Sequence, residues 1–196
     1  MTSIRGFLRG LVGKRPKFSW FKPTGALAAD LDAVVREASA HGHDGLALGG
    51  LDLAGRLGAL AHMTSLRALE LRDARLADED LAALAGRAEL EHLDLSGAPV
   101  NGACLVHLGG LPRLEHLDLS RTRLVDVAVL ALRSYPALAT LDVSGTRLTA
   151  GALAHLRLLP ALKQVRVGGL GLEQAAKDAF ASRPEVAVEC EAPVAV

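Results

Sequence analysis

The chain is poor in aromatic residues and cysteines and has no long apolar run, and each shortage narrows the classes of protein to which it can belong. Aromatic residues make up 3% of its 196 residues, so the core must be built mainly from Leu, Ala and Val. The two cysteines, Cys104 and Cys190, indicate neither a disulfide framework nor a Cys/His cluster. No apolar run approaches the ~20 residues of a membrane-spanning helix. We therefore expect one layered domain in the reducing cytoplasm.

Acidic residues are absent from residues 1–23, although the whole chain has 22 acidic and 22 basic residues. The six cations of this segment, taken from 22, leave 16 basic against 22 acidic residues in the remainder. A body with this net charge of −6 opposes nucleic acid, which we consider an unfavourable partner.

The sequence shows no feature typical of an enzyme. It has no Gly-rich phosphate loop, no nucleophile motif and no carboxylate pair set apart from a repeating pattern. We therefore expect no catalytic residues and no cofactor.

The abundant residue is leucine, and it recurs at a fixed spacing of 24 residues. One such column is Leu66, Leu90, Leu114, Leu138 and Leu162. A second is Leu69, Leu93, Leu117, Leu141 and Val165, and a third is Leu71, Leu95, Leu119, Val143 and Val167. An imperfect earlier copy begins near His43.

Each unit combines two periodicities. Segments such as residues 93–96 alternate apolar and polar residues, which indicates a strand with one buried face. Segments such as residues 148–159 space their apolar residues as a helix does, and Pro112, Pro136 and Pro160 end these helices before the next strand. Because one strand and one helix cannot close a core alone, the pattern predicts stacked copies.

This pattern resembles the leucine-rich-repeat family, whose strand motif is Leu-x-x-Leu-x-Leu-x-x-Asn-x-Leu. The matching residues in one unit are Leu114, Leu117, Leu119 and Leu124. The resemblance covers about residues 43–190 and implies an α/β solenoid with short parallel strands on a concave face and helices on a convex face. The family's Asn position holds Ala74, Ala98, Thr122, Thr146 and Leu170, as in a bacterial subgroup, and we expect the two Thr hydroxyls to replace part of the Asn hydrogen bonding.

Four segments are predicted along the chain. Residues 1–23 form a basic, aromatic-containing tail, and residues 24–42 form an N-terminal capping helix, with Thr24 capping a helix over about 26–40. The solenoid follows over residues 43–190 and closes with a helix over 173–181 and a strand over 186–190, both expected to contribute to its end. Residues 191–196 form a short tail. Cys104 and Cys190 are expected to face inward.

The polar strand residues are the first candidate binding surface, because they project from the concave face. The candidates for binding a partner are Glu70, Asp94, Asp118, Asp142, His92, His116, Arg123 and Arg147. The carboxylates suggest an acidic groove for a basic segment of a partner protein, but a repeated unit also copies its surface regardless of use. For His92 and His116 we favour ordinary surface histidines over a metal site, because neighbouring strand positions do not converge on one ion.

The N-terminal segment is the second candidate surface. Its partner- or membrane-binding residues are Arg5, Phe7, Arg9, Leu11, Lys14, Arg15, Phe18, Trp20 and Phe21. A basic amphipathic helix followed by aromatic residues suits a membrane surface or docking on a protein. Two functions follow from these features: a non-catalytic protein-binding scaffold or adaptor, or a peripheral membrane subunit of a larger complex anchored by this segment.

Overall fold

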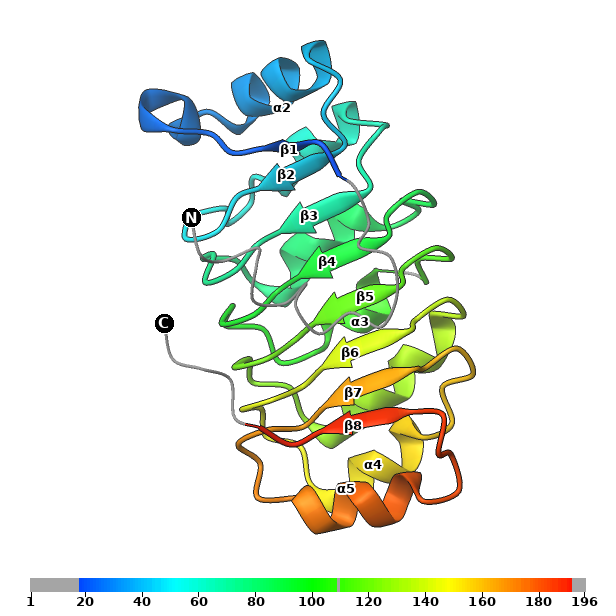
Figure 1. Cartoon of the computed structure of the whole chain (residues 1–196). Helices are drawn as coiled ribbons and strands as arrows, with labels where there is room; N and C mark the ends of the chain where they lie inside the picture. Colours follow the sequence, from blue (N-terminus) through cyan, green and yellow to red (C-terminus); the bar gives the residue numbers. More distant parts are fainter. Residues whose placement is uncertain (1–17, 109, 192–196) are drawn as a thin grey trace.

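Eight short parallel strands form one sheet in chain order, as Figure 1 shows. The computed structural model describes residues 18–108 and 110–191. The strands are β1 (Trp20–Phe21), β2 (Gly45–Ala47), β3 (Ala68–Glu70), β4 (His92–Asp94), β5 (His116–Asp118), β6 (Thr140–Asp142), β7 (Gln164–Arg166) and β8 (Ala187–Glu189). The predicted parallel solenoid is therefore confirmed.

The strand register reproduces the 24-residue spacing of the leucines. Leu93 pairs with Leu117, which pairs with Leu141, so each repeat lies directly beside the equivalent residues of the next. The side chains of these central leucines point into the core between the sheet and the helices, and they are fully buried. The β2–β3 step is one residue shorter, since Leu46 pairs with Leu69, and this accounts for the imperfect first copy.

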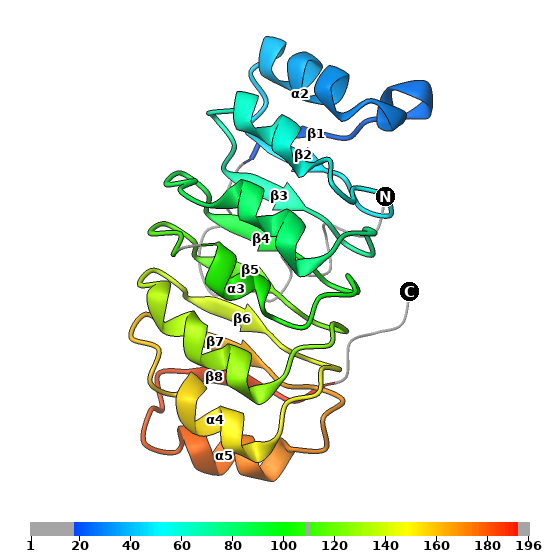
Figure 2. The ribbon, with the colours of Figure 1, turned by 180° about the vertical axis from the view of Figure 1, so that it is seen from behind.

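Helices cover the opposite face of the sheet, as the view from behind in Figure 2 shows. The 3-10 helices are η2 (Gly25–Ala29), η3 (Leu57–His62), η4 (Asp78–Leu84) and η5 (Asp126–Ser134). The α-helices are α2 (Leu31–Ala40), α3 (Cys104–His107), α4 (Ala150–Leu156) and α5 (Glu173–Phe180). The helical segment predicted in each unit is thus a 3-10 helix in three repeats and an α-helix in the others.

The two ends of the solenoid are covered as the sequence predicts, with one correction. Helix α2 packs Val34 and Val35 into the core at the N-terminal end. Its cap is Asp30, which accepts a hydrogen bond from Ala33 N–H at 3.1 Å, whereas Thr24 makes no side-chain capping bond. The physical reason is that η2 separates Thr24 from the start of α2. At the other end, α5 and β8 confirm the predicted helix and strand, and Cys190 packs against the core.

The two threonines at the family's Asn position form hydrogen bonds inside their own turns. Thr122 Oγ1 donates to the Leu119 carbonyl at 2.6 Å, and Thr146 Oγ1 donates to the Val143 carbonyl at 2.7 Å. Each Thr hydroxyl thus closes its own turn and does not link it to the neighbouring repeat. Ala98 has no hydroxyl, and its backbone N–H donates to the Leu95 carbonyl at 3.1 Å.

Candidate protein-binding surfaces

The polar strand residues form two columns along the face of the sheet that the helices do not cover, which we call the strand face. Parallel pairing places His92 beside His116 and Asp94 beside Asp118, and it continues to Asp142 in the next repeat. With Glu70, these residues complete the predicted carboxylate column. However, its four residues are only between 3% and 7% exposed. An acidic groove that attracts a basic partner requires carboxylates that are displayed more openly.

Each aspartate of this column is engaged with its own turn. Its carboxylate accepts a hydrogen bond from the backbone N–H two residues later, at distances of 2.8 to 2.9 Å. The pairs are Asp94 with Ser96, Asp118 with Ser120, and Asp142 with Ser144. The Asp-x-Ser pattern therefore closes the turn that ends each strand, which is a common local role for aspartate.

Burial also lowers the negative charge of the column. Burial, reinforced by the neighbouring carboxylates of Asp94 and Asp142, raises the pKa of Asp118 to about 8. Burial raises the pKa of Asp142 as well, and the guanidinium of Arg166 opposes this shift. Asp118 is therefore harder to ionise than an exposed aspartate, which makes the column less acidic than its composition indicates.

His92 and His116 are buried, and the expectation of surface histidines is wrong. The side chains are 4% and 8% exposed, and their ring centroids lie 6.1 Å apart. Burial lowers the pKa of His92 to about 3 and that of His116 to about 4. Within residues 18–108 and 110–191, no group of three or more His, Cys, Asp or Glu residues could hold a metal ion.

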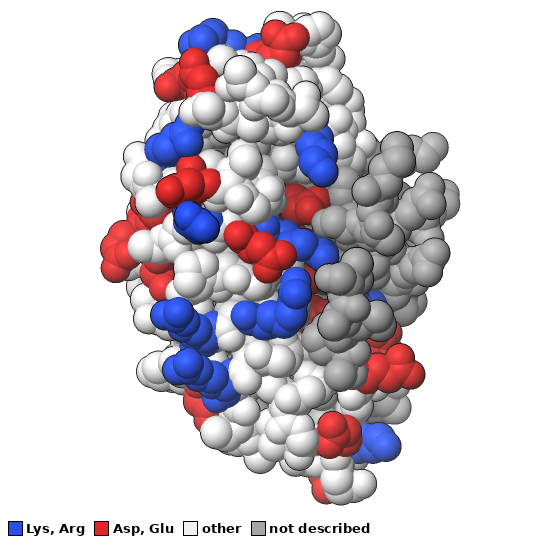
Figure 3. All heavy atoms as spheres, turned by 90° about the vertical axis from the view of Figure 1, so that its left-hand side faces the viewer, with Lys and Arg blue, Asp and Glu red and all other residues white. Residues whose placement is uncertain are grey.

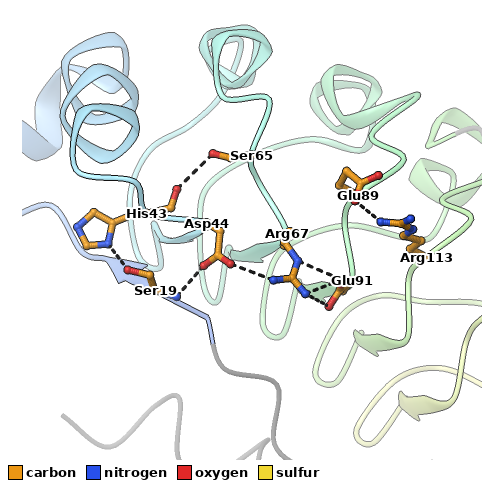
Figure 4. Close-up of polar contacts among 8 residues, drawn as sticks. All are labelled: Ser19, His43, Asp44, Ser65, Arg67, Glu89, Glu91 and Arg113. Carbon is orange, nitrogen blue, oxygen red and sulfur yellow. Dashed lines mark hydrogen bonds and ion pairs between the residues drawn. The ribbon is translucent and has the colours of Figure 1, made fainter.

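A polar network fastens β1 to the start of the solenoid, as Figure 4 shows. The Asp44 carboxylate accepts a hydrogen bond from Ser19 N–H at 2.6 Å, and the Ser19 hydroxyl lies 2.8 Å from His43 Nδ1. Arg67 joins this site to the next repeat, because it donates to Asp44 at 3.2 Å and to both Glu91 oxygens at 2.8 and 3.0 Å. The network fixes the position of the residues that precede β1.

The aromatic residues beside this network pack on the chain's own sheet. The rings of Phe18 and Trp20 lie 6.2 and 6.1 Å from His92, and the Arg67 guanidinium lies 5.6 Å from the Phe18 ring. Gly45 makes room for the indole, since a Cβ at this position would lie 3.0 Å from Trp20 ring atoms. The predicted tail thus contributes a strand to the sheet, although two residues are too few to show an alternating pattern.

The predicted tail residues consequently divide into two groups. Phe18, Trp20 and Phe21 contact their own solenoid, and Phe21 packs against the core. The other candidates lie outside the described residues, namely Arg5, Phe7, Arg9, Leu11, Lys14 and Arg15.

Exposed arginines mark a different surface, the strand-exit edge, where the chain leaves each strand. Arg75, Arg121, Arg123 and Arg147 are all exposed on this edge. Figure 3, which faces it, shows basic side chains gathered around the middle of the view. The backbone keeps register here, because Arg123 N–H donates to the Val100 carbonyl at 2.8 Å and Arg147 N–H donates to the Leu124 carbonyl at 3.1 Å. Arg123 and Arg147 therefore stand in adjacent repeats at equivalent positions.

A family model for a leucine-rich repeat matches residues 62–85, the stretch that contains β3 and η4. This stretch is one unit of the repeat that the structure stacks into its sheet. The repeat unit of the chain is similar to a leucine-rich repeat. A crystal structure of an internalin from Listeria monocytogenes is similar to it, with a TM-score of 0.47 and 16% identity. The alignment covers 77% of this chain and 53% of the internalin chain, so the chain spans about half the length of that protein. No curated protein matches the chain.

The sequence did not reveal the side chains that join successive leucine-rich repeats. Asp78, at the start of η4, is 8% exposed and accepts hydrogen bonds from three backbone N–H groups of the next repeat. The donors are Asn101 at 3.0 Å, Gly102 at 3.1 Å and Cys104 at 2.8 Å. Asp126, two repeats later, accepts from Thr149 N–H at 2.8 Å in the same way. Asp78 and Asp126 are 48 residues apart, which is two repeats, and this spacing could have revealed their shared role from the sequence.

Two further side chains reach across repeats. The Tyr135 hydroxyl donates to the Leu105 carbonyl at 2.7 Å, and Arg87 donates to the Met63 carbonyl at 2.6 Å, at the end of η3. Burial raises the pKa of the Cys104 thiol, so this cysteine is an unreactive core residue.

Proposed function

We propose that this protein is a non-catalytic scaffold or adaptor that binds another protein through its repeat surface. Leucine-rich-repeat folds are extended scaffolds on which proteins bind other proteins. The observation that carries the proposal is the strand-exit edge, where exposed arginines stand in register on a continuous sheet. The strand face is the weaker candidate, because its carboxylates are buried and bonded to their own turns.

The N-terminal segment is proposed to add a second contact. Residues 1–17 hold five cations and no acidic residue, whereas the rest of the chain is acidic. The proposed docking residues are Arg5, Phe7, Arg9, Leu11, Lys14 and Arg15. We place the complex in the cytoplasm, where two unpaired cysteines are compatible with a reducing environment.

A site-specific photo-crosslinker tests the scaffold proposal in the full chain. We expect a crosslinker at position 123, on the strand-exit edge, to give one dominant protein adduct in the native cell. A crosslinker at exposed position 133, on the helix face, is the matched control and should not give this adduct. Diffuse adducts of equal yield at both positions would contradict a defined binding surface.

The alternative proposal is a peripheral membrane subunit anchored by the N-terminal segment. Among the residues that the structure describes, no helix is both long and apolar enough to cross a bilayer. The aromatic residues Phe18, Trp20 and Phe21 are engaged with the sheet, so the anchor would have to lie within residues 1–17. Flotation of the full chain with anionic liposomes, compared with a variant lacking residues 1–17, tests it. If both forms stay with the unbound protein, the membrane proposal fails.

A further inference from the structure

Three exposed arginines of two adjacent repeats lie on the strand-exit edge, and we name this surface the arginine strip: Arg121, Arg123 and Arg147. All three side chains are exposed. Among the described residues, Arg123 and Arg147 have no ion pair or side-chain hydrogen bond. The ion pair of Arg121 with Asp73 is long, at 3.9 Å, and its two side chains are 44% and 56% exposed. The strip is therefore almost unneutralised within the chain.

The repeat spacing gathers positive charge on this edge. The backbones at positions 123 and 147 lie in adjacent repeats, which in a parallel sheet are about 4.8 Å apart. The two side chains thus bring positive charge to the same edge of the sheet, and like charges repel one another weakly in water. An anion that bridges them removes the repulsion and gains charge-assisted hydrogen bonds, which are stronger than those between neutral groups.

The backbone of Arg121 is an independent sign that its side chain has a use. Its φ is +59°, in the left-handed region that glycine adopts freely. The equivalent residues in three other repeats are Gly97, Gly145 and Gly169, with φ of +70°, +65° and +72°, and a fourth repeat has Asp73 at this position, with φ of +53°. An arginine here is strained, and strain of this kind concentrates at functional sites.

From these features we infer that the arginine strip binds an extended, Asp- and Glu-rich segment of the partner protein. This inference rests on the proposed scaffold function and names the chemistry of the partner. It reverses the charge expected from the carboxylate column, because those carboxylates are buried whereas the arginines are exposed.

An acidic peptide fits the strip better than nucleic acid does. Single strands bind where bases stack on aromatic side chains, and the exit loops at 72–77, 96–101, 120–125 and 144–149 hold no aromatic residue. A duplex presents a long polyanion to the whole body, which carries a net charge of −6 beyond residue 23. A short acidic segment interacts mainly with the strip itself.

The test measures binding of a fluorescein-labelled deca-glutamate peptide to the full chain by fluorescence anisotropy at low salt. The triple variant Arg121→Gln, Arg123→Gln, Arg147→Gln should lose about tenfold in affinity, since each exposed ion pair contributes modestly. The matched control, Arg113→Gln, Arg133→Gln, Arg157→Gln, removes three exposed arginines elsewhere and should change affinity less than about twofold. Equal losses in both variants would show attraction by net charge alone and would overturn the inference.

Two further measurements test whether the N-terminal segment or a nucleic acid accounts for binding at the strip. A variant with Arg5, Arg9, Lys14, Arg15 and Lys17 all changed to Gln should keep strip-dependent binding. If it loses that dependence, the peptide binds the N-terminal segment and the inference fails. A ten-nucleotide thymidine strand serves as the second probe. If it binds more tightly than the peptide and also depends on the strip, nucleic acid replaces the acidic peptide as the ligand.

The inference and the proposed function can fail separately. If the native adduct at position 123 forms but the triple Gln variant retains the partner's affinity, the scaffold stands and the acidic-segment inference falls. If no native partner is found, the scaffold proposal fails regardless of how the peptide binds.

Discussion

Replacing Arg121 with glycine should stabilise the fold while removing part of the arginine strip. Arg121 has a φ of +59° at a position where Gly97, Gly145 and Gly169 all have positive φ. A residue with a side chain in the left-handed region destabilises the folded state by about 1 to 2 kcal/mol, and glycine does not have this strain. Glycine in turn gives the unfolded chain extra freedom, worth about 0.4 to 1 kcal/mol. The net expectation is that Arg121→Gly is more stable than Arg121→Ala by about 1 kcal/mol.

The alanine variant serves as the reference because both substitutions lose the same charge. The lost ion pair to Asp73 is long and about half exposed, so it contributes only a fraction of the 0 to 1 kcal/mol of a surface pair. Urea unfolding followed by circular dichroism gives the free energies, provided the slope with urea is unchanged. Gly145→Ala, at φ +65°, is the mirror control and should lower stability by about 1 kcal/mol. If Arg121→Gly is no more stable than Arg121→Ala, the strain at this position is not real.

Three further predictions concern the inside of the solenoid. The pKa of Asp118 is raised to about 8, above its ordinary value near 4. The protonated side chain therefore stabilises the fold fully below pH ~4, and this contribution is lost as pH rises to about 8. Asp118→Asn should flatten this decline in urea titrations across that range, and an unchanged slope would contradict the assignment. Removing residues 1–23, which deletes β1 and its half-buried aromatic residues, should lower the free energy of unfolding by about 2 kcal/mol more than removing residues 1–17. Asp78→Ala should lower the free energy of unfolding by about 3 kcal/mol, because three backbone N–H groups of the next repeat lose their acceptor. Glu79→Ala, at the exposed neighbouring residue, is the control and should change it by less than about 0.5 kcal/mol. Similar losses in both variants would refute the role of Asp78 in joining the repeats.

The stacking of the repeats was predictable because burial enforces it. A leucine at every 24th position can be buried only if equivalent strand residues lie side by side, and Leu93, Leu117 and Leu141 do so. The helix type was not predictable, because a 3-10 and an α-helix bury similar apolar spacings over one or two turns. The capping residue was misassigned for a related reason: Thr24 and Asp30 both suit a helix start, and only the intervening η2 decides between them.

The candidate site was predictable in position but not in accessibility. The register placed Asp94, Asp118 and Asp142 in one column, as expected. Whether such a carboxylate faces a partner or its own turn depends on a hydrogen bond over two residues, which the repeating pattern cannot reveal. The strand β1 was hidden as well, because its position depends on long-range contacts of Ser19 with Asp44 rather than on a local pattern.

Parallel strands stacked in chain order also determine how the molecule responds to a pulling force on its two ends. Each repeat advances the stack by about 4.8 Å, yet its 24 residues span about 80 Å when extended. Each boundary between strands has only three paired residues in most of the sheet, so tension separates the boundaries singly, beginning at an end. Force spectroscopy should therefore record a staircase of extensions of about 75 Å each. A complex tethered through both ends of this chain would lengthen in steps under load and dissipate work at each one, as an extensible link does.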